Sequence, residues 1–528
     1  MPILQWIGKE KVVNHHLEVP CHVLSRTYSF DEEGQKEKDN GSENMVIHGD
    51  NLLALKSLLP QYEGRVKCIY IDPPYNTGNE GWVYNDAVND PVIKRWLGEV
   101  VGKEGEDLSR HDKWLCMMYP RLRLLQRLLS DDGVIFISID DREQVRLRMI
   151  CDEIFGERNF LAQFIWQKRT SPDMRKLVST SHEYICAYCK DIGNLESAIH
   201  KVALTEEDAA KYKNPDNDPR GPWASTDFTA QGYRPNQVYE ITTPGGAKYT
   251  PSKGHCWKNI ESEFQRQCAE GRIWFGLDGK GVPRRKTYLS EREGKNVWTW
   301  WDNKSVGHSQ EATKELSKIF GTSTVFDYPK PVRLIQRIVQ IATDKDSIVL
   351  DSFAGSGTTA HAVLKQNAED RGNRKFILIE MGDYADSITA ERVKRVIHGY
   401  GEGKKAVSGT GGDFSFYELG APLMKDGFLN EDASEKAIRD YVYFMDTREN
   451  RAQEKADEPY FLGTHQGAAY YFYYKKGEAT VLSYDFLATV KTEAESYVMY
   501  ADSCLLSAEE LSNYHITFKK IPRDIARL

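Results

Sequence analysis

Two short stretches carry residue types that could do chemistry together. The first is Asp72-Pro73-Pro74-Tyr75, in which a carboxylate, two prolines and an aromatic ring follow the apolar run KCIYI. The second is residues 351–360, DSFAGSGTTA, in which an apolar run meets a glycine-rich turn and then a helical pattern. Either could be a plain turn, because proline sets φ in strand-ending turns and glycine permits tight ones. A strand, glycine-rich turn and helix are also typical of a nucleotide-like ligand lying across the carboxyl edge of a sheet.

The glycine turn by itself fits several nucleoside ligands. Glu380 ends the next apolar stretch, FILIEM, where a carboxylate can accept both hydroxyls of a ribose. A nicotinamide cofactor would also place its pyrophosphate on the helix N-terminus. S-adenosylmethionine has no phosphate, and the carboxylate of Asp351 suits its ammonium group. The sequence has no G-x-x-x-x-G-K-[ST] pattern, which argues against an ATP-driven motor in this chain.

Seven apolar segments predict the strands that position these residues in a largely parallel sheet. They are MVIHG, KCIYID, GVIFISID, FIWQ, EYICAYC, SIVLDSFA and FILIEM. Helical periodicity covers residues 51–59, 113–129, 141–155, 331–343, 358–365 and 384–398. This alternation predicts an α/β doubly wound fold. At its switch point two strands deliver their loops to one crevice, so the two stretches should face each other across a ligand.

The alternation stops between residues 191 and 323, which are rich in Gly, Pro, Trp and basic residues and need their own core. A Gly-rich junction, GYGEGKKAVSGTGGD, precedes a C-terminal region of mixed pattern. We therefore predict an N-terminal arm (1–44), a sheet domain in two pieces (45–190 and 324–400), an inserted domain (191–323) and a C-terminal domain (412–528).

Composition bounds the class of protein. With 528 residues, 40% hydrophobic and 28% charged, the chain is expected to be globular with several domains. No apolar run reaches the roughly 20 residues of a membrane span, and the start lacks a secretory signal, so we expect a cytoplasmic location. The net charge of −8 argues against indiscriminate coating of nucleic acid. Nine scattered cysteines predict reduced thiols. The pair with metal-like spacing, Cys186 and Cys189, lacks a second pair, so no metal site is expected.

The order of the motifs, DPPY ahead of FAGSG with a long insertion between them, resembles the β class of amino-methylating DNA methyltransferases. The resemblance is closest to the modification (Mod) subunits of type III restriction systems and their solitary relatives. It runs through VIHGDNLLALKSLLPQYEGRVKCIYIDPPYNTG, DPRGPW, RIWFG, PRRKTYLSE, VGHSQEATKEL, YPKPVRLIQRI, VLDSFAGSGTTAHAV and FKKIPRDIARL. It implies a seven-stranded, circularly permuted, Rossmann-like sheet that binds S-adenosylmethionine, with residues 191–323 as the target-recognition domain.

The resemblance implies a catalytic role for DPPY. An exocyclic adenine amine is a poor nucleophile because its lone pair is delocalised into the ring. If the Asp72 carboxylate and the Pro73 carbonyl each accept one N6 hydrogen, the nitrogen becomes more tetrahedral and its lone pair can point at the sulfonium methyl. Pro73 and Pro74 stiffen the loop. Tyr75 supplies the ring on which a flipped base stacks, at about 1–3 kcal/mol.

The resemblance also implies cofactor-binding residues. Asp50 in HGDN would bind the adenine or amino end of the cofactor, and it also suits an N-cap. Lys330 in YPKP would neutralise the cofactor carboxylate, with a solvated lysine as the alternative. The rest of the predicted set follows the second motif and the next strand: Asp351, Phe353, Ala354, Gly355, Ser356, Gly357, Thr358, Thr359 and Glu380.

Double-stranded DNA is the implied substrate. The segment from Ile165 to Lys190 carries five basic residues against two acidic ones, a local net of +3 that predicts phosphate contacts. Base reading is expected in the inserted domain, which holds Arg220, Arg284, Arg285 and Lys286. The resemblance further suggests a homodimer and contact with a separate helicase–nuclease restriction subunit, through the C-terminal region.

Alternative functions remain at this stage. Cytosine-N4 methylation shares the amine mechanism, although Asp rather than Ser before Pro-Pro-Tyr favours adenine by family habit. Cytosine-C5 methylation needs a cysteine nucleophile, and the Pro-Cys pair at Cys21 lacks a strand-and-turn context. A catalytically silent DNA-binding specificity subunit would have no chemical need for Asp72, Tyr75 and the glycine turn together.

Overall fold

The computed structural model describes residues 3–76, 110–323, 325–425, 428–430, 432–449, 451, 455 and 457–521. Residues 77 and 78 of the first resemblance motif and the end of FKKIPRDIARL therefore lie outside the described residues. The chain divides into two compact units. The first comprises Met1–His200 and Trp298–Leu528, and the second comprises Lys201–Val297.

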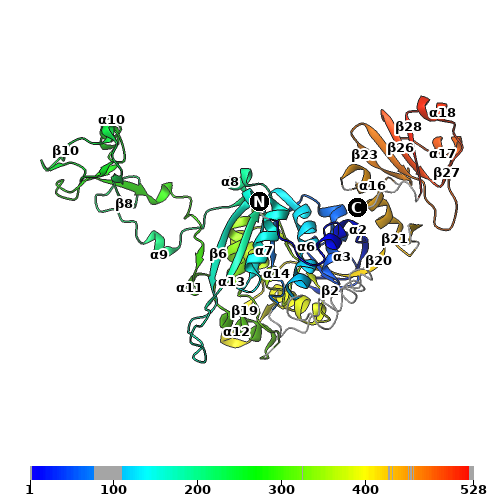
Figure 1. Cartoon of the computed structure of the whole chain (residues 1–528), viewed down its shortest axis with the longest axis horizontal. Helices are drawn as coiled ribbons and strands as arrows, with labels where there is room; N and C mark the ends of the chain where they lie inside the picture. The colour runs from blue at the N-terminus through cyan, green and yellow to red at the C-terminus, as the bar shows by residue number, and fades with distance from the viewer. Residues whose placement is uncertain are drawn as a thin grey trace. The chain divides into compact units, whose positions relative to one another are not determined.

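The first unit is built on an eleven-stranded sheet (Figure 1). Its order is β15 (Trp300–Trp301), β6 (Phe160–Gln167), β7 (His182–Cys189), β5 (Leu129–Ile139), β4 (Val66–Ile71), β16 (Ile348–Asp351), β17 (Lys375–Glu380), β3 (Met45–His48), β20 (Phe414–Pro422), β1 (His22–Asp31) and β2 (Gly34–Lys36). The seven strands predicted from the sequence are consecutive members, from β6 to β3. From β5 to β3 the pairs are parallel, and β7 is antiparallel to both of its neighbours. The predicted doubly wound, mostly parallel fold is confirmed.

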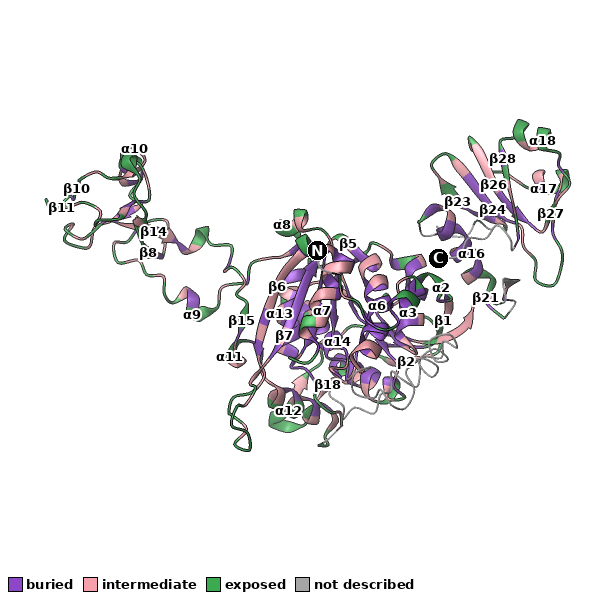
Figure 2. Ribbon diagram, in the orientation of Figure 1, coloured by how far each residue is buried: buried purple, intermediate pink, exposed green. Residues whose placement is uncertain are grey.

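Helices cover the sheet on both faces. From β4 the chain runs through α6 (Arg110–Leu128) to β5, and from β16 through α14 (Thr358–Asp370) to β17 on the opposite side. Because such crossovers are right-handed, α6 and α14 lie on opposite faces. A sheet covered in this way has strands that are apolar throughout. All six residues of β4 are accordingly buried, and Figure 2 shows the central strands in the buried colour.

The first-unit boundaries differ from those expected. β1, from the predicted arm, pairs antiparallel with β20, from the predicted C-terminal domain, and β20 lies parallel beside β3. β15, from the predicted insertion, pairs with β6. These edge strands are joined by pairings between residues far apart in the chain, which periodicity within each segment does not reveal.

The rest of the C-terminal region forms a smaller α/β layer. It comprises α16 (Glu435–Thr447) and a four-stranded sheet ordered β23 (Phe461–His465), β24 (Ala468–Phe472), β26 (Ser496–Ala501) and β28 (Ile516–Lys520). The aromatic run AAYYF forms β24, in which Tyr471 and Phe472 are buried. Its aromatic residues therefore serve as core.

The second unit lies inside the predicted inserted domain but is shorter. It has a three-stranded sheet, β13 (Ile273–Trp274), β14 (Arg284–Tyr288) and β8 (Trp223–Asp227), and a helix, α10 (Glu261–Ala269). Its core is aromatic and gathers Phe228, Trp257 and Phe264. Residues 298–323 belong to the first unit because they carry β15 and the amphipathic helix α12 (Ser309–Phe320).

Candidate functional site

The switch point of the sheet lies between β4 and β16. The two strands are parallel, with Cys68 beside Val349. Their carboxyl ends therefore bring Asp72 and Asp351 to one edge of the sheet. The topology thus brings the DPPY and glycine-turn motifs together, although the two aspartates are 279 positions apart in the sequence.

Asp72 is held from two sides. The Tyr75 hydroxyl donates a hydrogen bond to Asp72 Oδ1 at 2.7 Å, and Lys330 Nζ donates to Oδ2 at 2.5 Å. Lys330 Nζ also lies 3.0 Å from the Tyr75 oxygen and 5.2 Å from the centre of its ring. The Asp72 side chain keeps 24% of its surface exposed, so a polar group of a ligand can reach it.

The contacts of Lys330 differ from its expected role at the cofactor carboxylate. Its side chain is only 9% exposed, so the solvated-lysine alternative is wrong. In this structure the ammonium is paired with Asp72 and lies 3.7 Å from a second carboxylate, Glu183. Burying the Lys330 ammonium without an anionic partner would cost free energy, and these two carboxylates offset that cost.

Glu183 is the principal site residue that the sequence analysis missed. It stands on β7 among apolar residues and is 8% exposed. Lys168 Nζ donates to its Oε1 at 2.7 Å, and the Tyr75 hydroxyl lies 3.3 Å from its Oε2. A carboxylate inside an otherwise apolar strand segment, EYICAYC, was the available signal, because a buried charge needs partners.

The electrostatics of this cluster are set by burial and by its opposite charges. Burial disfavours the ammonium of Lys330, but Asp72 and Glu183 outweigh it and raise the pKa of Lys330. Burial likewise opposes ionisation of Glu183, and the charges of Lys330 and Lys168 outweigh it and lower the pKa of its carboxyl. Burial and the two carboxylates raise the pKa of Tyr75 well above its ordinary value. The cluster therefore holds a neutral phenol between charged partners.

The proline residues of DPPY fix the loop that carries the acceptors. The indole of Trp114, on α6, donates a hydrogen bond to the Pro74 carbonyl at 2.7 Å. Pro73 is buried. Its carbonyl receives no hydrogen bond from any residue that the structure describes. That oxygen, in the residue that follows Asp72, thus keeps its acceptor capacity unused by these residues.

The glycine turn between β16 and α14 requires its glycines. Gly355 and Gly357 have φ of 52° and 79°, in the left-handed region. A Cβ on Gly357 would lie 2.9 Å from the Thr389 carbonyl oxygen, and one on Gly355 would lie 3.2 Å from the Phe326 ring. Both positions therefore lack room for a side chain. Phe353 and Ala354, also in the predicted set, are buried beneath the turn.

Glu380 ties the turn to the next strand. Its two oxygens accept the backbone N–H groups of Gly355, at 2.7 Å, and Gly382, at 2.9 Å. Burial raises the pKa of Glu380, and these hydrogen bonds oppose the rise. In this structure the Glu380 carboxylate therefore positions the backbone of Gly355 and Gly382, and its predicted contact with a ribose stays a prediction.

Asp351 is 2% exposed and is held by its own loop. Its oxygens accept the Phe353 N–H at 3.0 Å and the Thr359 hydroxyl at 2.5 Å. Burial raises the pKa of Asp351 to about 7; Asp72 and Glu380 add to the rise, and the two hydrogen bonds oppose it. The carboxyl is therefore poised to titrate near neutral pH.

Asp50 occupies the N-cap of α3 (Asn51–Tyr62), as one of the two sequence interpretations expected. Its carboxylate accepts the backbone N–H groups of Leu52, at 2.7 Å, and Leu53, at 3.4 Å. Arg121 lies 3.5 Å from the same carboxylate. Asn51 also donates to the Ser352 carbonyl at 2.8 Å, which connects α3 to the glycine-turn loop.

A second missed residue is Arg392, on α15 (Glu391–His398). It is 1% exposed and donates to the hydroxyls of Ser356, at 3.0 Å, and Thr358, at 2.8 Å. Burial lowers the pKa of Arg392 to about 10. The guanidinium therefore orients the hydroxyls of Ser356 and Thr358, two of the predicted cofactor-binding residues. No spacing in the sequence indicated this contact.

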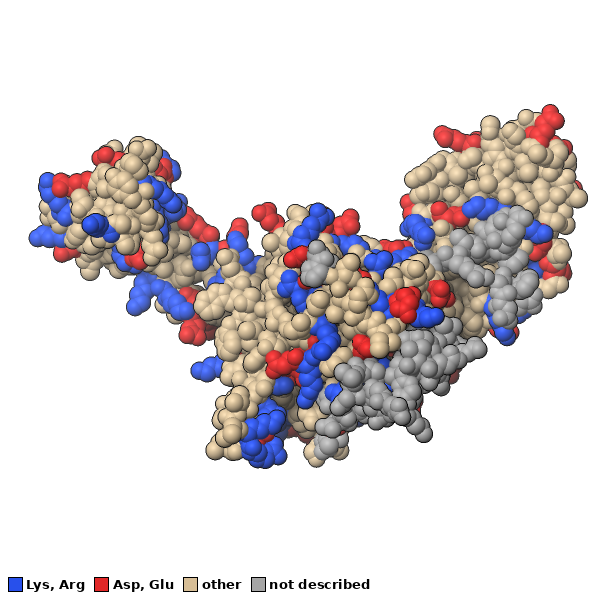
Figure 3. Space-filling view, in the orientation of Figure 1, with Lys and Arg blue, Asp and Glu red and all other residues tan. Residues whose placement is uncertain are grey.

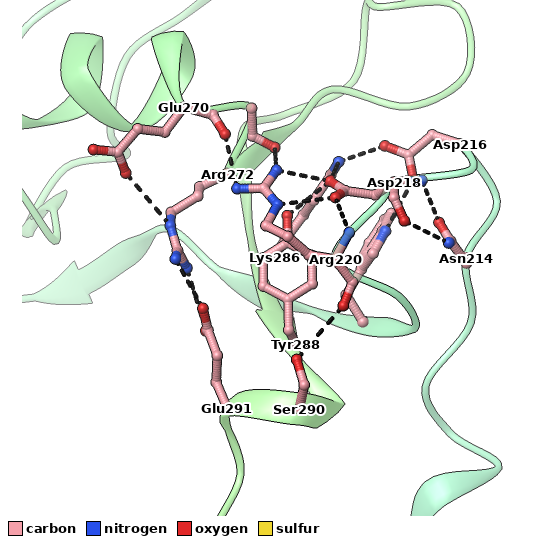
Figure 4. A network of polar contacts seen from close by, with 12 residues as sticks. Asn214, Asp216, Asp218, Arg220, Glu270, Arg272, Lys286, Tyr288, Ser290 and Glu291 are labelled. Carbon is pink, nitrogen blue, oxygen red and sulfur yellow. Dashed lines mark hydrogen bonds and ion pairs between the residues drawn. The ribbon is translucent and has the colours of Figure 1, made fainter.

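The inserted unit contains a separate polar network, shown in Figure 4. Asp218 of DPRGPW accepts hydrogen bonds from Arg220 at 2.8 Å and 2.9 Å, and from Lys286 and Tyr288 of PRRKTYLSE at 2.8 Å each. Hydrogen bonds therefore link the DPRGPW and PRRKTYLSE motifs within the unit. Of the four basic residues named in the region expected to read bases, Arg220 and Lys286 are engaged in this structural network, whereas Arg285 is exposed.

Among the residues that the structure describes, no group of three or more His, Cys, Asp or Glu side chains could hold a metal ion. No helix among them combines the length and the apolar character needed to cross a membrane. Burial raises the pKa of Cys21 to about 12, so its thiol is a poor nucleophile at neutral pH.

Comparison with known proteins adds the family. The sequence matches the N6_N4_Mtase model, described as DNA methylase, over residues 66–391. This match spans more than half of the chain and contains both motifs. The chain belongs to this DNA methylase family.

Individual members resemble the chain to different extents. The type III restriction-modification enzyme StyLTI Mod subunit of Salmonella typhimurium is 38% identical over 396 residues, covering 68% of this chain and 58% of the relative. The type II methyltransferase M.KpnI of Klebsiella pneumoniae is 33% identical over 357 residues, covering 65% of this chain and 81% of the relative. The solved M1.HpyAVI–SAM complex aligns with a TM-score of 0.31 and 14% identity, covering 66% of this chain and 98% of that one. This chain spans 56–66% of the length of four type III Mod relatives that it matches.

Proposed function

We propose that this protein is a site-specific DNA methyltransferase that transfers a methyl group from S-adenosylmethionine to N6 of a flipped-out adenine in double-stranded DNA. One observation carries the proposal: in a chain of the DNA methylase family, DPPY and the glycine turn meet at the switch point of the sheet. A ligand bound there lies against the turn and within reach of Asp72.

The residues at this edge fit S-adenosylmethionine better than a dinucleotide. The strand ends carry four acidic residues, Asp50, Asp72, Asp351 and Glu380, of which Asp50 and Asp72 keep part of their surface exposed. These suit a nucleoside that carries an ammonium and a sulfonium, and they oppose a pyrophosphate. The glycine turn follows the carboxyl end of β16, where the backbone of a βα turn lies against a nucleoside ligand. When bound, S-adenosylmethionine supplies a methyl group on a cationic sulfur.

The chain's own residues prepare the amine. The Asp72 carboxylate and the Pro73 carbonyl each accept a hydrogen from N6, which directs the nitrogen lone pair and stabilises the developing positive charge. The Tyr75 ring stacks on the flipped base. The pKa of Tyr75 is raised, so the phenol stays neutral and continues to donate to Asp72.

DNA contacts must come from local basic segments. On the face drawn in Figure 3, Lys and Arg side chains are interspersed with Asp and Glu. In the connection between β6 and β7, Arg169 and Lys176 are exposed, next to the exposed apolar side chains of Met174 and Leu177. We assign phosphate contacts to this connection and base reading to the inserted unit.

The proposal also includes the proteins with which this chain associates. The relative StyLTI is a Mod subunit of a type III restriction-modification enzyme, and we infer that this chain is a modification subunit or a solitary relative. A homodimer and a helicase–nuclease restriction subunit are the proposed partners, with the C-terminal region as the contact. The rival cytosine-N4 activity belongs to the same family model, and Asp at position 72 favours adenine.

The test is expression in a host free of DNA methylation, followed by sequencing of modified bases. We expect N6-methyladenine at one short motif, and its loss in Asp72→Asn. Asp132→Asn is a matched control, because Asp132 pairs with buried Lys67 at 2.5 Å and Lys67 is the second residue of β4, the strand that Asp72 follows. N4-methylcytosine in place of N6-methyladenine would refute the adenine assignment. Intact DNA binding without any methylation would refute the enzymatic function and support the silent-subunit alternative.

A further inference from the structure

The environment of Asp72 contains one more carboxylate than the amine mechanism uses. Glu183 and Asp72 both contact Lys330 and Tyr75, from β7 and from the loop after β4. Lys168 balances the second carboxylate, so the four charged side chains form two pairs. Burying two ion pairs side by side costs desolvation free energy, so the arrangement is expected to serve a purpose.

Lys330 and Tyr75 are shared unequally between the two carboxylates. Lys330 Nζ lies 2.5 Å from Asp72 and 3.7 Å from Glu183, and the phenol oxygen lies 2.7 Å from Asp72 and 3.3 Å from Glu183. The phenol has one proton and can donate it to one carboxylate at a time. The Lys330 ammonium and the Tyr75 hydroxyl therefore both donate to Asp72, and Glu183 is a second acceptor close to both.

A substrate amine must compete with this arrangement. The ammonium on Asp72 Oδ2 occupies an acceptor that an N6 hydrogen needs, and it repels the positive charge that develops on N6. A displacement of about 1 Å would bring Lys330 from 3.7 Å to an ordinary ion-pair distance from Glu183. The ammonium then keeps a carboxylate partner while Asp72 is released.

We propose that Glu183 is a positioning residue that holds Lys330 against Asp72 and Tyr75 and takes over the ammonium when the substrate amine binds Asp72. This inference rests on the proposed methyltransferase function and adds a residue to it. The groups facing Lys330 are Asp72 and Tyr75 from the DPPY loop and Glu183 from β7, with the Trp166 ring of β6 at 6.0 Å. Removing the charge of Glu183 therefore makes deprotonation of Lys330 easier.

The test compares Glu183→Gln with Glu153→Gln in the full chain. Glu153 is a matched control, since it pairs with Lys9 at 2.7 Å and accepts the Tyr119 hydroxyl at 3.0 Å, away from Asp72. Single-turnover methylation of a duplex, calorimetric binding of S-adenosylmethionine and the pH–rate profile are measured for each. We expect Glu183→Gln to lower the rate constant near neutral pH at least tenfold and to change the cofactor Kd less than twofold. We also expect it to change the alkaline limb of the profile, where the rate constant recovers because a deprotonated Lys330 no longer holds Asp72.

Glu183→Asp provides a second variant, which keeps the charge. We expect it to retain the alkaline limb of the wild type while lowering the rate constant. The inference is overturned if Glu183→Gln matches Glu153→Gln, if the cofactor Kd weakens in proportion to the rate, or if the Asp variant shifts the alkaline limb as far as the Gln variant. A wild-type protein that methylates no adenine would instead refute the proposed function.

Discussion

Replacement of Asp351 by Asn tests how burial controls the cofactor edge. Asp351 is 2% exposed, and burial raises its pKa from 3.8 to about 7 despite hydrogen bonds from Phe353 and Thr359. Asparagine has nearly the same shape and does not titrate. The comparison therefore isolates the free energy of ionising this one carboxyl inside the fold.

The sign and size of the pH dependence of stability follow from the linkage between folding and proton binding. Because the folded-state pKa is raised, the carboxyl's contribution to stability is fully present below about pH 4 and is lost as the pH rises through about 7. A shift from 3.8 to about 7 is roughly three pKa units, which corresponds to about 4 kcal/mol in the free energy of unfolding. The wild type should lose this amount relative to Asp351→Asn.

Thermal unfolding of both proteins from pH 4 to pH 8 measures this difference. We expect the midpoint of the wild type to fall by several degrees relative to the variant across this range. Infrared spectra at pH 5.5 should show a protonated-carboxyl band in the wild type that is weaker in Asp351→Asn. A midpoint difference that stays constant with pH, together with an unchanged band, would refute the reasoning.

Three further predictions concern other parts of the structure. Gly357→Ala should destabilise the protein by about 1–3 kcal/mol, because φ is 79° and the new Cβ would meet the Thr389 carbonyl, and thermal unfolding will measure it. Asp218→Asn should destabilise the inserted unit by about 3 kcal/mol, since a buried lysine and an arginine lose their shared anion. Hydrogen exchange of residues 201–297 measures the stability of this unit. The control is Asp227→Asn, which removes an exposed ion pair and should change stability by less than about 1 kcal/mol. Tyr75→Ala should lower kcat/KM by the equivalent of about 1–3 kcal/mol of stacking, and Tyr75→Phe by less, because the ring remains. Equal losses in the two Tyr75 variants would contradict a stacking role.

The local features of the site could be predicted from neighbouring residues. Asp50 was recognised as a possible N-cap because a carboxylate directly before a helical pattern can accept the free N–H groups of the first turn, and it does so. The strands β4 and β16 were recognised because both faces of a covered parallel sheet are apolar. Each inference required only residues within one segment.

The partners of the site residues depended on contacts that sequence separation hides. Lys330 pairs with Asp72 across 258 positions, and Glu183 lies 108 positions from Tyr75. Nothing in YPKP distinguishes a lysine for a cofactor from one for a carboxylate. Only the packing of α13 (Val332–Ala342) against β4 and β5, with β7 on the other side of β5, places the ammonium between two acids.

The sequence by itself determined the strands, the turn and the chemical groups at each strand end, because hydrophobic periodicity, glycine and capping act over a few neighbouring residues. The tertiary structure decided which groups share a proton or a charge. Coulomb energy and desolvation depend on distance and burial in three dimensions. For that reason the near-neutral pKa of Asp351, the pairing of Lys330 and the position of Glu183 were decided only when β4, β7 and β16 assembled into one sheet.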